Sequence, residues 1–200
     1  TVKQLHKRFG DRPECRIVVH EQNKGVAGSI MTGLKNADNE IVCSMDADCS
    51  YDPLEFLSMI PRLNNGVDMV TASPYHPDGF VLGVPAWRLL LSKTLSRMYH
   101  VVLRHKLATY TSCFRVYRRS RVCDIELSHT DFRGIVELLA RIDFAGGSIT
   151  EHPATLQSRI FGHSKMKTLK TIWGHVKLLA VLWSGTGIRH RVTFSKGKAQ

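Results

Sequence analysis

Two aspartates separated by one residue are the side chains in this sequence best suited to chemistry. Asp46 and Asp48 stand in the segment MDADCSYDP, directly after the apolar run EIVCSM at 40–45, and Asp52 follows them closely. Carboxylates at this spacing suit a hard divalent cation such as Mg²⁺ or Mn²⁺, which binds few protein oxygens and completes its shell with substrate phosphates. Asp-x-Asp pairs also occur in turns and helix caps, so it is the position after a buried strand that favours metal binding here.

Arginines in the segment TSCFRVYRRSR, at 111–121, form a second candidate site. The alternation of residue types in CFRVY predicts a strand. Its two faces would carry Cys113, Arg115 and Tyr117 on one side and Phe114 and Val116 on the other. Arg115 at a sheet edge would bind a diphosphate through charge-assisted, bidentate hydrogen bonds, and Arg118 would extend the positive charge. The alternative is a cluster of surface arginines without a ligand.

A third candidate site lies in SRIFGHSK, where Arg159, Ser164 and Lys165 precede the final predicted helix. Backbone amides at the start of a helix, together with a lysine and an arginine, form a natural site for an anion. The alternative is an ordinary helix cap at Ser164 with solvated basic neighbours.

The elements that must position these residues alternate between strands and helices. Apolar runs predict strands at 15–20, 40–45 and 68–73, and helical patterns occupy 1–10, 27–37 and a stretch that begins at Pro53 and carries Leu54, Leu57, Ile60 and Leu63. Such an alternation predicts an α/β fold with a mostly parallel, two-sided sheet. Ligands bind these sheets at the carboxyl ends of the strands, where Asp46 and Asp48 are expected.

A long helix is predicted from Trp87 to about Arg104. Its apolar residues recur at helical spacing and its basic residues gather on the opposite side. The apolar set is Trp87, Leu90, Leu91, Leu95, Met98, Tyr99 and Val102, and the basic set is Lys93, Arg97, His100 and Arg104. A similar pattern with nearby lysines returns at 166–183. Such a helix either packs on the sheet with a solvated basic side or lies on an anionic membrane surface.

The composition is that of a globular domain with a basic surface. The 200 residues are 43% hydrophobic and 22% charged, which excludes a disordered chain. A formal charge of +11 attracts nucleic acid, nucleotide sugars or anionic lipid head groups.

The five cysteines lack a CxxC spacing, so reduced thiols are expected rather than disulfides or a zinc site. The sequence opens with polar residues and without a recognisable signal peptide, and its apolar runs fall short of the roughly 20 residues of a spanning helix. We therefore expect a cytoplasmic protein with peripheral membrane contact.

In their order along the chain, these motifs resemble those of family 2 glycosyltransferases, in particular the polyprenyl- and dolichol-phosphate mannosyltransferases. The resemblance rests on NKGVAGSIMTGL, MDADCSYDP, SCFRVYRR and RIFGHSK, and it runs from about residue 15 to about residue 180. It implies a GT-A fold and an inverting transfer from a nucleotide-sugar donor, of the GDP-mannose or UDP-glucose type, to a polyprenyl phosphate. It also implies donor binding at Asn23 and Gly25, Mg²⁺ or Mn²⁺ at Asp46 and Asp48, and a catalytic set. That set is Asp48, Arg115, Arg159 and Lys165, with Arg118 and Ser164 as further phosphate-binding residues.

The sequence also departs from the family pattern. Family members begin with two strands that end in PxYNE-like and DDGSTD-like motifs, and neither motif is present. Residues 1–200 are therefore expected to form one partial GT-A domain without its first two strands, with a basic tail at 189–200. Cys113 replaces the usual glycine, Pro74 stands where many members carry arginine, and Ser50 where glutamine is common. These changes imply a distinct subgroup.

Two rival functions follow from the same residues. A glycosyltransferase that acts on a hydroxyl group would need a carboxylate base, for which Asp131 and Glu137 are candidates. An ionised phosphate acceptor needs no such base, because its second pKa is near ~6. The other rival is a basic nucleic-acid-binding module. It is disfavoured because aromatic residues, on which bases would stack, are not interleaved with the basic residues. We therefore expect no nucleic-acid partner.

Overall fold

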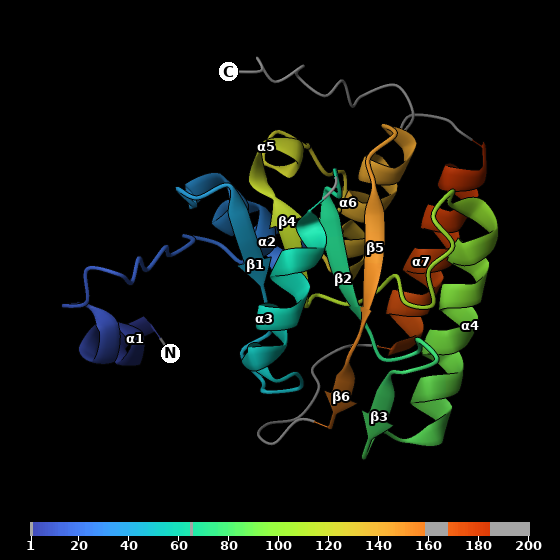
Figure 1. Cartoon of the computed structure of the whole chain (residues 1–200), viewed down its shortest axis with the longest axis horizontal. Coiled ribbons are helices and arrows are strands. Elements are labelled where there is room, and N and C mark those ends of the chain that lie inside the picture. The colour runs from blue at the N-terminus through green and yellow to red at the C-terminus, as the bar shows by residue number, and fades with distance from the viewer. Residues whose placement is uncertain (1, 65, 159–167, 185–200) are drawn as a thin grey trace.

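The chain folds into a mixed sheet with helices on both faces, and the computed structural model describes residues 2–64, 66–158 and 168–184 (Figure 1). The α-helices are α1 (Val2–Phe9), α2 (Gly25–Asn36), α3 (Phe56–Met59), α4 (Ala86–Val102), α5 (Arg119–Val122), α6 (Phe132–Phe144) and α7 (Thr168–Ser184). Two short 3₁₀ helices, η1 (Pro53–Glu55) and η2 (Ile60–Leu63), flank α3. The strands are β1 (Ile41–Ser44), β2 (Met69–Ser73), β3 (Phe80–Leu82), β4 (Arg115–Arg118), β5 (Ile149–Pro153) and β6 (Thr155–Gln157).

The central sheet has four strands in the order β1-β4-β2-β5. β2 and β5 pair in parallel, whereas β4 runs antiparallel to both of its neighbours, β1 and β2. The predicted α/β class is confirmed. The prediction of a mostly parallel sheet holds for the strand directions, since β1, β2 and β5 point the same way, but not for the pairings. Apolar runs favour strands but do not give the direction of the neighbouring strand. They do not guarantee burial either, because β1 lies at the edge of the sheet with exposed and half-buried residues.

The register brings one end of each central strand to the same edge of the sheet. Ser44, the last residue of β1, lies opposite Arg115, the first residue of β4. Thr71 of β2 also lies opposite Arg115, and Ser73 at the end of β2 lies opposite Pro153 at the end of β5. The loops after β1 and β2 therefore meet the loop before β4. The small parallel sheet of β3 and β6 extends the molecule beyond this edge (Figure 1).

Alternating side chains of β2 and β4 divide the hydrophobic core into two layers. Met69 and Tyr117 pack on one face of the sheet, with residues of α2, α4, α6 and α7. Val70, Phe114 and Val116 pack on the other face, with residues of α3 and η2. The predicted alternation of CFRVY is confirmed, because Tyr117 lies in one layer and Phe114 and Val116 lie in the other.

Most of the predicted elements are present, but the strand predicted at 15–20 is not. The helix predicted at 27–37 corresponds to α2, and the strands at 40–45 and 68–73 correspond to β1 and β2. Residues 15–20 form no ladder with any described residue, and Val18 and Val19 are 48% and 53% exposed. A strand needs a hydrogen-bonded neighbour as well as apolar residues.

The helix predicted to begin at Pro53 is divided into η1, α3 and η2. The carboxylate of Asp52 caps its start by accepting a hydrogen bond from the N–H of Leu54 over 2.9 Å. Leu54 and Leu57 are 66% and 71% exposed, so the apolar stripe predicted for this segment is wrong at its first two positions. Leu63, at the end of the segment, is buried as expected.

Helix α4 is present as predicted, but its apolar stripe is divided between two sides. Ser96 and Tyr99 are buried where α4 packs against α7. Trp87 and Leu90 are 54% and 64% exposed and share the solvent side with Lys93. The predicted separation of an apolar face from a basic face is therefore wrong, because α7 covers only a narrow strip of α4. Within the described residues, no helix combines the length and the apolar content needed to cross a bilayer.

Candidate active site

A cavity of about 680 Å³ opens at the edge of the sheet where β1 and β2 end. The loops after both strands line it, together with the loop before β4, the N-terminal half of α4, the first residue of α6 and one side of α7. Its lining includes Asp46, Asp48, Tyr75, Arg88, Ser112 and His175. The strand topology therefore brings the two aspartates together with polar side chains that are distant in sequence.

The turn after β1 orients the carboxylate of Asp48. The backbone N–H of Ser50 donates to Oδ1 of Asp48 over 3.1 Å, and the hydroxyl of Ser50 contacts the same oxygen. Cys49 between them has φ +57°, a left-handed conformation that only tight turns normally require. Asp48 is half-buried and Asp46 is exposed. Ser50 thus supports the acidic pair by holding one of its carboxylates.

Stacked aromatic rings hold this turn against the start of β4. The ring of Tyr51 stacks on Phe114 with a centroid distance of 5.0 Å, and Phe56 stacks on the same ring at 4.1 Å. Aromatic pairs of this kind stabilise by roughly 0.5–1.5 kcal/mol beyond their buried area. The acidic turn is consequently anchored to the central strand rather than free in solvent.

Two neutral groups flank Asp46. Burial, followed by the negative charge of Asp46, raises the pKa of the Cys113 thiol to about 12. Burial likewise raises the pKa of Tyr51. Both groups therefore stay protonated at neutral pH, and the charge at this end of the cavity comes from the aspartates.

The acidic pair fits a divalent cation that shares its coordination with a phosphate ligand. Among the described residues, no three His, Cys, Asp or Glu side chains are arranged to enclose a metal ion. Mg²⁺ and Mn²⁺ do not require such a cage, because one or two carboxylates plus substrate phosphates and water suffice. Asp46 and Asp48, at the mouth of a cavity large enough for a ligand, provide hard oxygen atoms of the right kind.

Arg115 does not reach the cavity, which corrects its predicted role in phosphate binding. The side chain is 0% exposed. One terminal nitrogen donates to the carbonyl of Ile135 and the other to the carbonyl of Tyr110, each over 2.8 Å. The two bonds tie β4 to α6 and to the loop before β4. Arg115 therefore acts as a buried anchor beneath the site.

Arg118 also lies away from the aspartates. It pairs with Ile41, at the start of β1, whereas the acidic turn follows the end of that strand. Its guanidinium donates to the carbonyl of Leu63 over 2.7 Å. The strand direction explains the place of Arg118, because β4 runs antiparallel to β1 and carries its later residues away from the cavity.

Asn23 and Gly25 build the start of α2. The side-chain oxygen of Asn23 accepts a hydrogen bond from the N–H of Gly25 over 2.8 Å. Gly25 has φ +70°, and a Cβ there would lie 2.5 Å from the carbonyl oxygen of Thr130. Glycine is therefore required where α2 approaches the loop before α6. The structure gives these two residues a backbone role, and donor binding by them stays a prediction.

The three remaining predicted residues, Arg159, Ser164 and Lys165, lie outside the described residues. Their predicted role in phosphate binding stays a prediction. Ser158, the last described residue before them, lines the cavity, and its N–H donates to the carbonyl of Leu82 over 2.9 Å.

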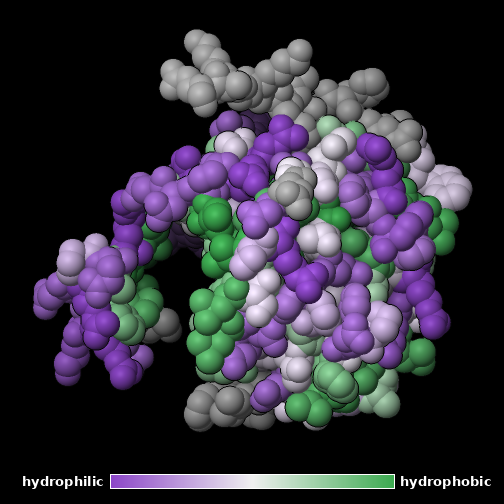
Figure 2. Space-filling view, in the orientation of Figure 1, coloured by the Kyte–Doolittle hydropathy of each residue, from purple (hydrophilic) through white to green (hydrophobic). Residues whose placement is uncertain are grey.

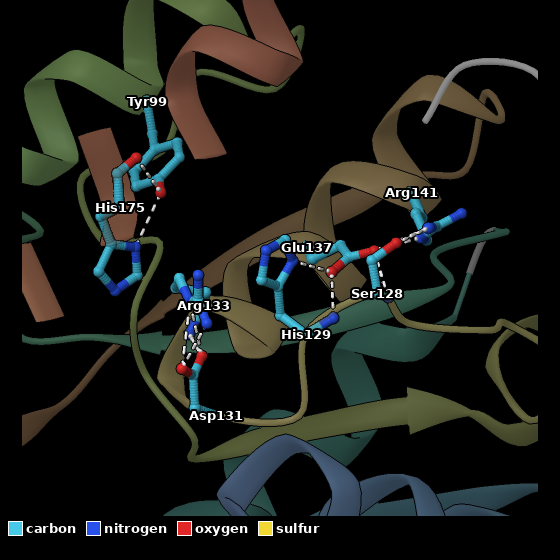
Figure 3. Close-up of polar contacts among 8 residues, drawn as sticks. All are labelled: Tyr99, Ser128, His129, Asp131, Arg133, Glu137, Arg141 and His175. Carbon is cyan, nitrogen blue, oxygen red and sulfur yellow. Dashed lines mark hydrogen bonds and ion pairs between the residues drawn. The ribbon is translucent and has the colours of Figure 1, made fainter. Parts of the chain in front are cut away.

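Glu137 is a fully buried carboxylate that holds the loop before α6 (Figure 3). It accepts hydrogen bonds from the N–H of Ser128 at 2.8 Å, from the N–H of His129 at 3.0 Å and from Arg141 at 2.7 and 2.9 Å. The ring of His129 also lies 2.8 Å from it. Burial acts to raise the pKa of Glu137, but the hydrogen bonds from Ser128, His129 and Arg141 outweigh it and lower that pKa.

Asp131 and Arg133 form an ion pair at the start of α6 (Figure 3). The carboxylate of Asp131 caps the helix by accepting from the N–H of Arg133 at 2.9 Å, and it binds the guanidinium at 2.9–3.1 Å. Partial burial opposes the effect, but these hydrogen bonds lower the pKa of Asp131. The pair lines a second cavity of about 340 Å³, together with Trp173 and Lys177 of α7.

Several lining residues could not be identified from the sequence. Arg88 belongs to the predicted helix, but its place on the cavity side depends on how α4 packs. Tyr75 follows β2, and its ring lies 5.4 Å from the ammonium group of Lys93. His175 stands in a helical pattern that predicts only an apolar side. For Arg88 and His175 the useful signal would have been the contact between α4 and α7, which no local pattern encodes.

Comparison with protein families gives a match to Glycosyl transferase family 2 over residues 1–125. The chain is 31% identical over 161 residues to a polyprenol monophosphomannose synthase from Mycolicibacterium smegmatis, a match that covers 77% of this chain and 61% of that protein. It is 27% identical over 174 residues to a dolichol-phosphate mannosyltransferase from Pyrococcus furiosus, covering 85% of this chain and 49% of that protein. The chain thus spans about half to three-fifths of the length of these two relatives.

The fold is shared with glucosyl-3-phosphoglycerate synthase from Mycobacterium tuberculosis. A crystal structure of that enzyme with Mn²⁺ and UDP-glucose superposes with a TM-score of 0.59 at 16% identity, over 90% of this chain and 60% of that one. A second structure, with phosphoglyceric acid, gives a TM-score of 0.58. The predicted GT-A fold is confirmed by these likenesses, and divalent metal occurs among its structural neighbours.

Proposed function

Because the chain belongs to glycosyl transferase family 2, we propose that it transfers a sugar from a nucleotide-sugar donor to a polyprenyl phosphate with inversion. The donor would be of the GDP-mannose or UDP-glucose type. The observation that carries the proposal is the acidic pair Asp46 and Asp48 at the mouth of a cavity of about 680 Å³. Relatives named as polyprenol- and dolichol-phosphate mannosyltransferases support the lipid acceptor.

Asp46 and Asp48 would hold Mg²⁺ or Mn²⁺. When bound there, the ion supplies positive charge beside the diphosphate that leaves the sugar. Ser50 contributes by keeping the carboxylate of Asp48 in one orientation. Cys113 and Tyr51 remain neutral, so they add no negative charge next to the diphosphate.

The acceptor phosphate would attack the anomeric carbon from the side opposite the diphosphate. A bond forms between that carbon and a phosphate oxygen, the bond to the diphosphate breaks, and a nucleoside diphosphate leaves. Arg88 lines the cavity and would bind one of the two phosphate groups. Arg159 and Lys165 would supply further positive charge, on the evidence of their sequence motif. Charge-assisted hydrogen bonds of this type offset the repulsion between donor and acceptor.

A hydroxyl acceptor is less well supported, because both candidate bases are engaged. Glu137 is 0% exposed and accepts hydrogen bonds from Ser128, His129 and Arg141. Asp131 is bound to Arg133 on both carboxylate oxygens. A base must lie near the reacting proton, and neither carboxylate lines the main cavity.

We further propose that the surface around β3 and the start of α4 docks on an anionic membrane. Phe80, Leu82, Trp87 and Leu90 are each more than half exposed, and Figure 2 shows hydrophobic residues at this lower end of the molecule. Lys93 lies on the exposed side of the same helix. Interfacial segments combine exposed aromatic or aliphatic side chains with basic ones in this way. Leu91 and Arg88 of the same helix line the cavity, so a lipid acceptor would enter directly from the docked surface.

The test uses the full-length protein with radiolabelled GDP-mannose or UDP-glucose, polyprenyl phosphate and Mn²⁺ or Mg²⁺. Label should pass into the lipid fraction in wild type and be lost in Asp48→Asn. Asp52→Asn is the matched control, because Asp52 caps η1 and does not line the cavity. Efficient transfer by Asp48→Asn, or transfer only to a sugar hydroxyl, would contradict the proposal.

A further inference from the structure

His175 is a buried histidine that the proposed mechanism leaves unused. It projects from α7, is 2% exposed and lines the main cavity together with Asp46 and Asp48. Its Nδ1 lies 2.8 Å from the hydroxyl oxygen of Tyr99, a buried residue of α4. Figure 3 shows the ring held at Nδ1 by this contact, with its other nitrogen turned away from Tyr99. Among the described residues, Tyr99 is the hydrogen-bond partner of the ring, and it engages Nδ1 alone.

The contact with Tyr99 occupies Nδ1 and leaves Nε2 for a ligand. A tyrosine hydroxyl has one proton to donate. If Tyr99 donates to Nδ1, the ring proton resides on Nε2 and that nitrogen is a donor. If Tyr99 donates to the carbonyl oxygen of His175 at 3.5 Å, Nδ1–H donates to the tyrosine oxygen and Nε2 is an acceptor. In either tautomer Nε2 lies on the side away from Tyr99 and can form one hydrogen bond.

The ring is also neutral. Burial lowers the pKa of His175 to about 4, with smaller effects from Asp131, Arg133 and His129. A neutral imidazole nitrogen is a weak partner for a phosphate, which prefers charged donors. It is well matched to a hydroxyl group, which can both donate and accept a hydrogen bond.

We propose that Nε2 of His175 forms a hydrogen bond with a hydroxyl group of the sugar and so helps to determine which sugar is transferred. The inference rests on the proposed function. If the diphosphate of the donor lies at Asp46 and Asp48, the sugar is attached directly to it and must occupy the same cavity. Thr109, Thr111 and Ser112 line that cavity as well and surround the sugar with further hydroxyl groups.

Two substitutions of similar size separate this role from a structural one. Glutamine places an amide N–H near the position of Nε2, whereas asparagine places one near Nδ1, next to Tyr99. His175→Gln should therefore keep the contact with the sugar, and His175→Asn should lose it. The loss of one neutral hydrogen bond should lower kcat/KM of His175→Asn by about 3- to 10-fold. Thermal melting checks that both variants fold.

The decisive comparison uses donors that lack single hydroxyl groups. Wild type, His175→Gln and His175→Asn are assayed with GDP-mannose or UDP-glucose, whichever wild type transfers, and with its 2-, 3-, 4- and 6-deoxy analogues. The inference predicts that the deficit of His175→Asn disappears with one of these analogues and persists with the others. An equal deficit with every analogue, or equal deficits for the two variants, would overturn it while leaving the proposed function intact. If wild type transfers neither sugar, the proposed function fails and this inference fails with it.

Discussion

Replacement of Arg115 by alanine should destabilise the fold and leave the chemistry of the folded protein largely unchanged. The sequence motif predicts that Arg115 touches a phosphate, in which case its loss would slow transfer and leave the fold unchanged. In the structure the side chain is 0% exposed and donates to the carbonyls of Tyr110 and Ile135 over 2.8 Å each. The two descriptions lead to opposite results for the same variant.

The expected loss of stability follows from those two bonds. A hydrogen bond from a charged group contributes about 1.5–3 kcal/mol, and a buried acceptor left without a partner is penalised on a similar scale. Two such bonds give a loss of about 3–6 kcal/mol, which is a large part of the roughly 5–15 kcal/mol by which native proteins are stable. For a chain of this size, each kcal/mol lowers Tm by about 2–4 °C. Arg115→Ala should therefore melt about 6–24 °C below wild type.

The assay combines thermal melting by circular dichroism with transfer measured well below the lower Tm. Arg118→Ala is the matched control, because it removes an arginine from the same strand that is only partly buried and makes one bond, to the carbonyl of Leu63. Its Tm should fall by much less. If Arg115→Ala melts with wild type and yet loses transfer by about 100-fold or more, Arg115 binds a ligand and the structural role assigned here is wrong.

Three further outcomes are expected. Asp48→Ala should lower metal-dependent transfer by at least about 100-fold with little change in Tm, and turnover that persists in EDTA would exclude the metal site. Because the pKa of Glu137 is lowered by folding, the stability it contributes is complete above the unfolded pKa of about 4.3 and is lost as pH falls further, toward the folded value. The difference in unfolding free energy between wild type and Glu137→Gln should thus shrink below that pH, and a constant difference would argue against an ionised Glu137. Lys93→Glu combined with Arg97→Glu should weaken sedimentation with anionic vesicles by about 30-fold at low salt, since each basic group contributes about 1 kcal/mol. Unchanged sedimentation would remove this helix from the membrane surface.

The sequence was informative wherever local chemistry alone decides the structure. Asp46 and Asp48 were predicted directly after a strand because an apolar run stops abruptly before them, and β1 ends at Ser44. The strand was also predicted to be buried, which is wrong, because β1 is an edge strand whose residues alternate between exposed and half-buried. The start of the following helix was predicted from Pro53, and the cap by Asp52 confirms it. Signals of this kind depend on neighbours in the chain and survive any tertiary arrangement.

The sequence failed where the outcome depends on a distant partner. Alternation in CFRVY gave the correct faces for Phe114 and Tyr117 but could not show that β4 is antiparallel. That direction decides which arginine lies near the acidic turn, and burial under α6 then removes Arg115 from the cavity. The phosphate-binding role predicted for Arg115 rested on the assumption that a charged residue is accessible, whereas this guanidinium is buried and donates to two backbone carbonyls.

The helices α4 and α7 connect the proposed membrane surface with the cavity. Each has one side on the cavity and another in solvent: Arg88 and Trp87 on α4, and His175 and Trp173 on α7. The hydrogen bond between Tyr99 and His175 joins the two helices behind the cavity wall. A force on the exposed sides, such as insertion of Trp87 into a bilayer, therefore acts on the same rigid elements that shape the cavity. We therefore expect that contact with the membrane influences the position of His175 through the packing of the two helices. In that case detergent-solubilised enzyme should discriminate among deoxy sugars less sharply than enzyme bound to vesicles, and equal discrimination in the two settings would contradict this expectation.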